Sequence, residues 1–226
     1  MAPRLARSIA AAALTCLPVG VAAVLVRTQW DPLISADRAA IAAATDLTRD
    51  HPGLRDALIA WQEVFLPWHV YAAAVPVLAW VWSRGLRGRA IWGFITMMVG
   101  WNLGLDAKLL VQRARPLLED PVSSAPGFSF PSGHAFNVAM AATTCVVLMW
   151  PLMGSRFARL AVSALAAVLI VVTALDRVYL GVHFPSDVVA GVLLALGLVA
   201  ASWVGFMHQP NPARSTAPPG PPPETV

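Results

Sequence analysis

The stretch Val188–Met207 reads VVAGVLLALGLVAASWVGFM, twenty residues without one charged side chain. A helix of about twenty apolar residues is ~30 Å long, which matches the hydrocarbon thickness of a bilayer. The run therefore predicts a membrane-spanning helix. The apolar pattern extends back to about Ser186, so we expect this helix over Ser186–Met207.

Five further apolar runs precede it, at Ser8–Val26, about Val64–Trp82, Ala90 to about Leu110, His134–Leu152 and Leu160–Leu175. The first follows Arg4 and Arg7 as in a signal peptide, but no clear small-residue cleavage site and hydrophilic domain follow it, so we expect it to be retained. Pro18, Pro67 and Pro76 lie inside runs and are expected to kink helices without ending them. The sequence predicts an all-α bundle of six transmembrane helices.

The composition supports a lipid environment. Of the 226 residues, 58% are hydrophobic and only 12% are charged, against about 25% charged in soluble domains. The net charge of +4 comes from scattered arginines without a basic run, which disfavours a nucleic-acid partner. We expect one membrane domain over residues 1–208. Residues 209–226 are rich in proline and polar residues, which predicts a disordered tail.

The segment between the first two runs, Trp30 to about Glu63, is predicted to hold short interfacial helices with a break at His51–Gly53. Whether this long loop covers the molecule as a lid is left open by the sequence.

Basic residues predict the orientation. Arg4 and Arg7, the group Arg84, Arg87 and Arg89, and the pair Arg156 and Arg159 flank the runs on one side. That side should be cytoplasmic, together with both termini. Four cations crowd the opposite, extracytoplasmic side, where they are disfavoured: Lys108, Arg113, Arg115 and Arg177. A role other than topology must keep them there.

Two of three notable residue groups precede the fourth run. In the first, Lys108 stands seven residues before Arg115-Pro116. Basic residues at a helix end also commonly reach toward lipid headgroups, so this group alone is weak evidence for a functional site. The second is Pro131-Ser132-Gly133-His134 at the start of the run. Ser is a favoured N-cap and Gly admits a ligand, so the helix start suits a phosphate, although a plain helix start is the alternative.

The third group is Asp176-Arg177, then His183-Phe184-Pro185-Ser186-Asp187. Pro185 suits the first turn of a helix, which leaves His183 just before it. The Asp187 carboxylate can then reach back to the imidazole and hold one ring nitrogen, as a nucleophile or base requires. An ordinary capping interaction is the alternative.

Successive membrane-spanning helices alternate in direction, so the three groups are expected at the same membrane face. Charges at membrane depth are costly and usually functional. Two histidines among three cations make a poor metal site, because metals prefer carboxylate or thiolate ligands without competing positive charge. An anion fits better, so we expect no metal and no cofactor.

The three groups, Lys108-x6-Arg115-Pro116, Pro131-Ser132-Gly133-His134 and Arg177-x5-His183-x3-Asp187, resemble the three-part signature of the type 2 phosphatidic acid phosphatase superfamily. The superfamily includes membrane lipid phosphatases, soluble acid phosphatases and vanadium haloperoxidases. The membrane branch fits this apolar chain.

The resemblance implies a role for each matching residue. His183 would attack phosphorus and form a phosphohistidine, Asp187 would orient it, and His134 would protonate the leaving oxygen and then activate water. The remaining residues would bind the phosphoryl oxygens: Lys108, Arg115, Ser132, Gly133 and Arg177. The family usually has Ser where Asp176 stands, and Asp176 either aims Arg177 or adds negative charge against the substrate.

The leading hypothesis is thus a multi-pass membrane lipid phosphatase with its site at the extracytoplasmic face. Its substrate would be a lipid phosphate or diphosphate: polyprenyl diphosphate, phosphatidylglycerol phosphate or phosphatidic acid. A lipid phosphotransferase with the same phosphohistidine is the alternative within the enzyme class. A transporter or structural membrane protein would explain the helices but not the motif spacing. The sequence leaves the oligomeric state open.

Overall fold

The computed structural model describes residues 2–207, and every regular element within this range is a helix. The predicted tail at 209–226 lies outside the described residues. The elements are α1 (Ala2–Arg27), α2 (Asp31–Asp50), α3 (Pro52–Val64), α4 (Pro67–Ser83), α5 (Arg87–Val111), α6 (Gly133–Met149), the 3-10 turn η1 (Trp150–Leu152), α7 (Arg156–Tyr179) and α8 (Pro185–Met207).

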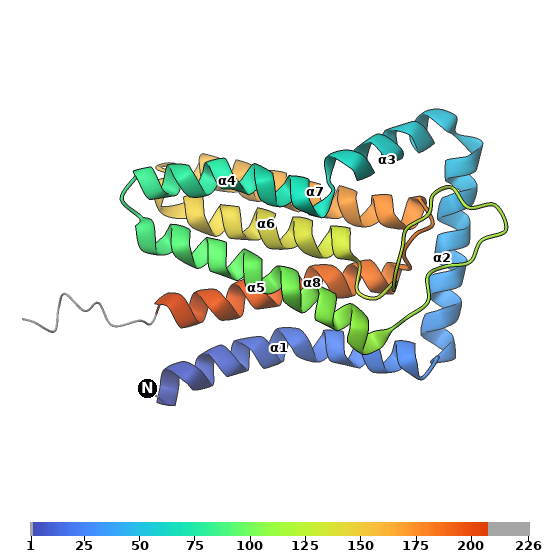
Figure 1. Cartoon of the computed structure of the whole chain (residues 1–226), viewed down its shortest axis with the longest axis horizontal. Coiled ribbons are helices and arrows are strands. Elements are labelled where there is room, and N and C mark those ends of the chain that lie inside the picture. The colour runs from blue at the N-terminus through green and yellow to red at the C-terminus, as the bar shows by residue number, and fades with distance from the viewer. Residues whose placement is uncertain (1, 208–226) are drawn as a thin grey trace, which may run out of the picture.

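The long helices run side by side, and α2 stands across one end of them (Figure 1). From that end, α3 leads back to α4, while the irregular segment between α5 and α6 folds against α2. The carboxyl end of α5, the start of α6 and the α7–α8 connection all meet beneath α2. Alternating helix direction has therefore collected the three sequence groups at one end, as predicted.

The all-α prediction is confirmed. Among residues 2–207, the helices α5, α6 with η1, α7 and α8 are each long and apolar enough to cross a membrane. A fifth span results if α3 and α4, which are bent by 57° at their junction, are counted as one. Within the residues searched for spans, α1 contributes only the apolar stretch Cys16–Arg27, so the sixth predicted span is not tested and stays a prediction.

Two details of the predicted helices are wrong. Pro67 does not kink a helix, because it is the first residue of α4, the position where a missing N–H is harmless. The segment after α1 does break at His51 as predicted, but its first helix, α2, has 20 residues and is not short.

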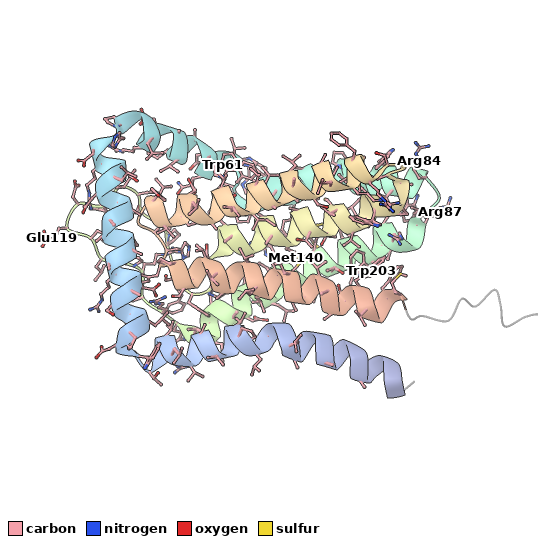
Figure 2. The ribbon with its side chains drawn as sticks, turned by 180° about the vertical axis from the view of Figure 1, so that it is seen from behind. Trp61, Arg84, Arg87, Glu119, Met140 and Trp203 are labelled. Atoms are coloured by element: carbon pink, nitrogen blue, oxygen red, sulfur yellow. The ribbon has the colours of Figure 1, made fainter. Side chains whose placement is uncertain are left out.

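The packing of α5 against α6 depends on glycines. Gly93, Gly100 and Gly104 lie at spacings of seven and four residues, which places them on one helix face. A Cβ at Gly100 would lie 2.5 Å from Met140 Cε, and one at Gly104 would lie 3.0 Å from Phe136 Cε1. Met140 is at the centre of the bundle (Figure 2). Small residues of this kind allow close approach of membrane helices.

One face of α2 is buried against the bundle. It carries Ile34, Asp37, Ile41, Thr45 and Thr48, with spacings of three, four and seven residues that follow the helical period. Thr48 Oγ1 donates to the carbonyl oxygen of Tyr179 at 2.9 Å. The helix is therefore fixed to the carboxyl end of α7.

Candidate active site

The α6 amino terminus forms the centre of the site. Ser132 is the N-cap residue of α6 and is fully buried. Its backbone N–H donates to the carbonyl oxygen of Asp187 at 2.9 Å, but its hydroxyl has no hydrogen-bond partner among the described residues. A buried hydroxyl without a partner at a helix amino terminus is suited to a bound anion.

Gly191 of α8 makes this position possible. A Cβ there would lie 2.8 Å from the carbonyl oxygen of Ser132 and 3.3 Å from the amide nitrogen of Phe136. Both neighbours are backbone atoms, which cannot rotate away. The approach of α8 to the start of α6 therefore requires a glycine.

We predict that Gly191→Ala displaces the start of α6 from α8 and lowers kcat/KM for phosphate release by up to about 100-fold, because displacements near 1 Å have effects of that order. Thermal unfolding should also move to lower temperature, since overpacking costs roughly 1–3 kcal/mol. Gly154→Ala is the matched control, because a Cβ at Gly154 meets nothing within 4 Å. Parent-like activity in Gly191→Ala would show that the close approach is dispensable.

Lys108 lies in the last turn of α5 and reaches toward the same helix start. Its Nζ donates to the carbonyl oxygen of Phe128 at 2.8 Å, and its Cε would lie 3.6 Å from a Cβ on Gly133. The ammonium group is thus held beside Gly133, so that one ligand could contact both residues.

Arg115 joins the loop after α5 to the α7–α8 connection. Its Nη1 donates to the carbonyl oxygen of Val182 at 2.8 Å and lies 3.0 Å from His183 Nε2. Its Nε donates to the carbonyl oxygen of Gly127 at 3.0 Å. These contacts hold the guanidinium directly in front of the imidazole.

The imidazole of His183 is buried, with 3% of the residue exposed. Its Nδ1 lies 3.5 Å from Asp187 Oδ2, and a guanidinium donor faces its Nε2. This arrangement favours the tautomer with the proton on Nδ1 and the lone pair on Nε2. Burial lowers the pKa of His183 to about 4, although the Asp187 carboxylate opposes that change. The ring is therefore neutral at pH 7.

The Asp187 carboxylate is fully buried and well supplied with donors. Oδ1 accepts from Arg113 Nη1 at 2.6 Å. Oδ2 accepts from the backbone N–H of Phe184 at 2.9 Å and from the Ser129 hydroxyl. The carboxylate is held in one orientation toward His183, as its predicted role requires.

Arg177 approaches from the last turn of α7. Its Nε donates to Asp176 Oδ2 at 2.7 Å, and a second N–H donates to the same oxygen. Its Nη1 donates to Gln62 Oε1 at 2.9 Å. Asp176 thus pairs with Arg177, which is the first of the two alternatives that the sequence left open.

His134 completes the group from the first turn of α6. Its Nε2 is buried and has no hydrogen-bond partner among the described residues. It lies within electrostatic reach of His183 and of all three predicted cations. The structure therefore brings together every predicted site residue: His183, His134, Asp187, Lys108, Arg115, Ser132, Gly133 and Arg177.

Sequence reasoning missed several residues of the site: Asp37, Gln62, Ser129 and Gly191, together with the role of Arg113, which it counted only as a cation. For Asp37 a signal was available. It shares the apolar face of α2 with Ile34 and Ile41, and a carboxylate on such a face implies a buried partner. Gly191 and Ser129 carry no comparable local signal.

A small cavity of about 160 Å³ opens beside the site between α4, α5 and α6. Trp101, Leu105 and Phe136 supply apolar walls, and Lys108 and Ser132 lie at its polar end. The cavity therefore offers apolar surface next to the cations. Among residues 2–207, no group of three His, Cys, Asp or Glu side chains is arranged to hold a metal.

Comparison with known proteins agrees with this geometry. The family model of the PAP2 superfamily matches residues 90–210. Phosphatidylglycerophosphatase B of Bacillus subtilis (strain 168) is 35% identical over 115 residues, covering 48% of this chain and 55% of that protein. Undecaprenyl-diphosphatase of Sulfolobus acidocaldarius is 32% identical over 125 residues, covering 50% of each. The chain thus spans about half the length of these relatives.

The fold matches a solved structure, the transmembrane PAP2-type phosphatidylglycerolphosphate phosphatase from Bacillus subtilis. The TM-score is 0.73 at 22% identity, with 85% of this chain and 96% of that chain covered. The family match contains every residue from Lys108 to Asp187 that the motifs identified. This multi-pass membrane protein belongs to the PAP2 superfamily.

Proposed function

We propose that this chain is an integral membrane lipid phosphatase that removes a terminal phosphate from a lipid phosphate or diphosphate. One observation carries the proposal: a neutral His183, backed by Asp187, faces a pocket of three cations in which Ser132 Oγ and His134 Nε2 have no hydrogen-bond partner within residues 2–207. Unpartnered buried donors among cations are the arrangement that a phosphoryl group would satisfy.

The reaction follows from these positions. His183 Nε2 attacks phosphorus, and the phosphorus–oxygen bond to the lipid breaks in line with the new nitrogen–phosphorus bond. His134 gives a proton to the departing lipid oxygen. It then takes a proton from water, whose oxygen attacks the phosphohistidine and releases inorganic phosphate and neutral His183.

The cations supply the electrostatic part of catalysis. Lys108, Arg115 and Arg177 reach the pocket from three different elements, and the α6 amino terminus adds backbone N–H groups. Fixed donors that match the charge of the transferring phosphoryl group are usually the largest catalytic term. The small cavity beside Lys108 would receive the first part of the lipid chain.

The substrate candidates are phosphatidylglycerol phosphate, a polyprenyl diphosphate and phosphatidic acid. The names of the two relatives favour the first two. The test is purification in detergent and measurement of phosphate release from each lipid, with and without EDTA. Release that survives EDTA and is accompanied by an acid-labile phosphohistidine would support the proposal. No release from any of these lipids, or loss of release with EDTA, would overturn it.

The proposal includes the membrane topology. We infer that α1 is the sixth span, that α2 and α3 lie at the extracytoplasmic surface with the site, and that both termini are cytoplasmic. Arg84 and Arg87 lie at the end of the bundle away from α2, whereas Glu119 lies beyond α2 (Figure 2). The arginines at the first of these ends support its cytoplasmic location under the positive-inside rule. In intact cells, an impermeant thiol reagent should label Glu119→Cys but not Arg87→Cys; the reverse would invert the topology.

A phosphotransferase is the second candidate, because the same phosphohistidine can pass its group to an acceptor other than water. The observation in its favour is the burial of His183, which limits access of water. A transporter or structural role is the remaining alternative, and it predicts no trapped phosphate on His183.

We predict that Asp176→Ser retains phosphatase activity within about tenfold of the parent protein. Arg177 keeps its contact with Gln62, and serine can replace one of the two hydrogen bonds, so that the loss is about one charge-assisted bond of ~1.5 kcal/mol. Steady-state kinetics on the preferred lipid measures this. A complete loss of activity in a folded variant would show that Asp176 has a role beyond aiming Arg177.

A further inference from the structure

A chain of buried charges links α2 to the site. Asp37 on α2 accepts from Arg113 Nη2 at 2.7 Å, and Arg113 Nη1 donates to Asp187 Oδ1 at 2.6 Å. Asp187 in turn faces His183 Nδ1 at 3.5 Å. Asp37, Arg113, Asp187 and His183 are all buried, with at most 7% of each residue exposed.

The same carboxylate holds the start of α8. Asp37 Oδ1 accepts from the backbone N–H of Ser186 at 3.0 Å, and its Oδ2 accepts from the Ser186 hydroxyl. Arg113 also packs over the Phe184 ring, with its guanidinium carbon 4.1 Å from the ring centre. Every residue from Phe184 to Asp187 except proline is thus held by this pair or by one of its partners.

We propose that Asp37 and Arg113 are positioning residues for the reaction at His183, an inference that rests on the proposed phosphatase function. Their side-chain hydrogen bonds run to each other, to Ser186 and to Asp187, so they act through Asp187. Arg113 fixes the carboxylate and offsets part of its charge, and Asp37 fixes Arg113 and the helix turn that carries Asp187.

The charges around His183 predict a specific change in the pH profile when Arg113 is replaced. The charged or titratable groups coupled to His183 are Asp187, Arg115, Lys108 and His134, and Arg113 is the cation paired with the first of these. Without Arg113, the Asp187 carboxylate would stabilise protonated His183 more strongly. Because the nucleophile must be neutral, the acidic limb of the pH profile would then move to higher pH.

The experiment measures kcat, KM and the pH profile of kcat/KM for phosphate release by the full-length chain in detergent. For Arg113→Gln we expect kcat to fall by up to about 100-fold and the acidic limb to rise by about one pH unit from its parent position. For Asp37→Asn we expect a comparable fall in kcat. The acidic limb of the pH profile should not move to higher pH, because Arg113 still pairs with Asp187. KM should change little in both.

Two variants serve as controls. Arg113→Lys keeps the charge and should leave the acidic limb near its parent position. Asp50→Asn removes an exposed carboxylate from the same helix and should leave all three quantities unchanged. Ionisation of the lipid phosphate itself is the same in all variants, so a shift of the limb between variants is assigned to the protein.

Removal of one member of a buried ion pair can unfold a protein, because the other charge is left unpaired. The double variant Asp37→Asn/Arg113→Gln removes both charges and keeps hydrogen-bonding groups. If this variant is folded by gel filtration and has the parent kcat and pH profile, the positioning role is wrong. An inactive parent protein would instead refute the proposed function.

A separate observation concerns a groove between α5 and α8 at the far end of the bundle from the site. Its volume is about 720 Å³, in the range of ligand pockets. Ile91, Ile95 and Val99 line it and are each about half exposed. It therefore opens sideways, toward the space that lipid chains fill in a bilayer.

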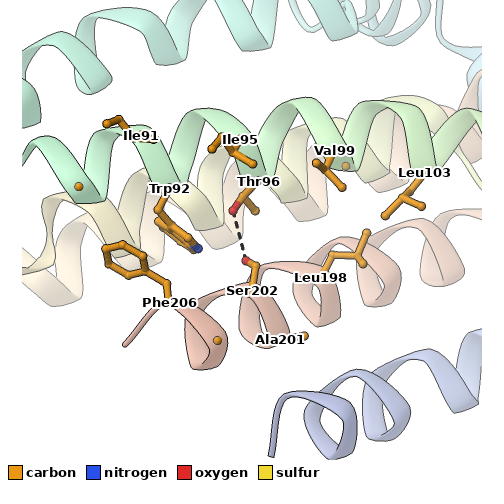
Figure 3. A pocket seen from close by; sticks show the side chains of 13 residues that line it. Ile91, Trp92, Ile95, Thr96, Val99, Leu103, Leu198, Ala201, Ser202 and Phe206 are labelled. Atoms are coloured by element: carbon orange, nitrogen blue, oxygen red, sulfur yellow. Dashed lines mark hydrogen bonds between the residues drawn. The ribbon is translucent and has the colours of Figure 1, made fainter. Parts of the chain in front are cut away.

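The groove contains a buried polar group without a partner. Trp92 is 6% exposed, and its indole Nε1 has no hydrogen-bond acceptor among the described residues. Figure 3 shows this nitrogen directed toward the α8 side of the groove, near the hydrogen-bonded pair Thr96 and Ser202. A ligand that carries an acceptor at this level would satisfy the indole N–H.

Arg89 supplies positive charge at the same end, next to Gly88 of the groove lining, and its Nη1 donates to the carbonyl oxygen of Val147 at 3.1 Å. Its guanidinium carbon lies 4.6 Å from the centre of the Trp203 ring, which packs against Trp92 at 4.9 Å between ring centres. The geometry points to a bound anionic glycerophospholipid, with its phosphate at this basic end of the groove, an ester carbonyl at Trp92 and an acyl chain along the groove.

Native mass spectrometry of the delipidated protein, titrated with phosphatidylglycerol or phosphatidylcholine, tests this site. We expect one phosphatidylglycerol to bind more tightly than phosphatidylcholine, and Trp92→Phe to weaken it by about tenfold, the value of one hydrogen bond. Ala201→Phe, which narrows the groove, should weaken both lipids, and Trp82→Phe outside the groove neither. Equal binding of both lipids by all four proteins would leave only non-specific lipid contact and would refute the site.

Discussion

Replacement of His183 by Asn is expected to lower kcat/KM for lipid phosphate hydrolysis by at least about 10⁴-fold, as for the loss of other covalent nucleophiles. Asn keeps a polar group near Asp187 but has no nitrogen at the Nε2 position that faces Arg115. The buried hydrogen-bonding network around Asp187 is therefore largely kept, and the variant should fold.

The measurement combines steady-state phosphate release with trapping of enzyme-bound phosphate from a ³²P-labelled lipid after a rapid acid-free quench. The parent protein should retain label that is lost in acid, and His183→Asn should retain none. Gel filtration and thermal unfolding serve as controls for folding. Retention of label by His183→Asn would assign the nucleophile to another residue, while loss of label with parent-like turnover would exclude a phosphohistidine.

Replacement of His134 by Asn is expected to lower kcat by about 10²–10⁴-fold, the usual contribution of a general acid–base group. The effect should depend on the leaving group. A lipid alcohol needs a proton to depart, whereas a nitrophenolate does not, so the first chemical step with nitrophenyl phosphate should be much less affected.

Hydrolysis of the intermediate still needs a base in that variant. With nitrophenyl phosphate, His134→Asn should release nitrophenolate in a burst and accumulate labelled phosphohistidine. The same rate loss for both substrates and no burst would show that His134 binds the phosphoryl group without transferring a proton. His69→Asn is the matched control, because His69 is only partly buried and its Nδ1 contacts the carbonyl oxygen of Glu63 at 2.8 Å.

The parts of the site that could be predicted are those encoded locally. The start of α6 at Gly133 and of α8 at Pro185 follows from the cap and proline rules, so the positions of Ser132, His183 and Asp187 relative to their helices were readable from the sequence. Alternation of helix direction then placed them at one end. The roles of individual residues came from the family resemblance and remain predictions.

The parts that could not be predicted depend on contacts between distant segments. Asp37 and Arg113 are separated by 76 residues, and nothing in the mixed charges of the first loop identifies which carboxylate faces the site. The need for Gly191 arises from the distance between two backbones, which no local pattern encodes. Pro67 was misread because an apolar run does not distinguish a kinked helix from a helix that begins at a proline.

The glycines that line α5 have a practical consequence for hybrid proteins built from this chain and its relatives. Because Gly93, Gly100 and Gly104 accommodate particular large side chains of α6, each helix is shaped to its neighbour. In a chimera that takes α5 from one parent and α6 from another, the large side chains of α6 would not match the positions of the small residues on α5. Exchange of both helices together as one unit preserves the fit, and the crossover points then belong in the loops before Arg87 and after Leu152.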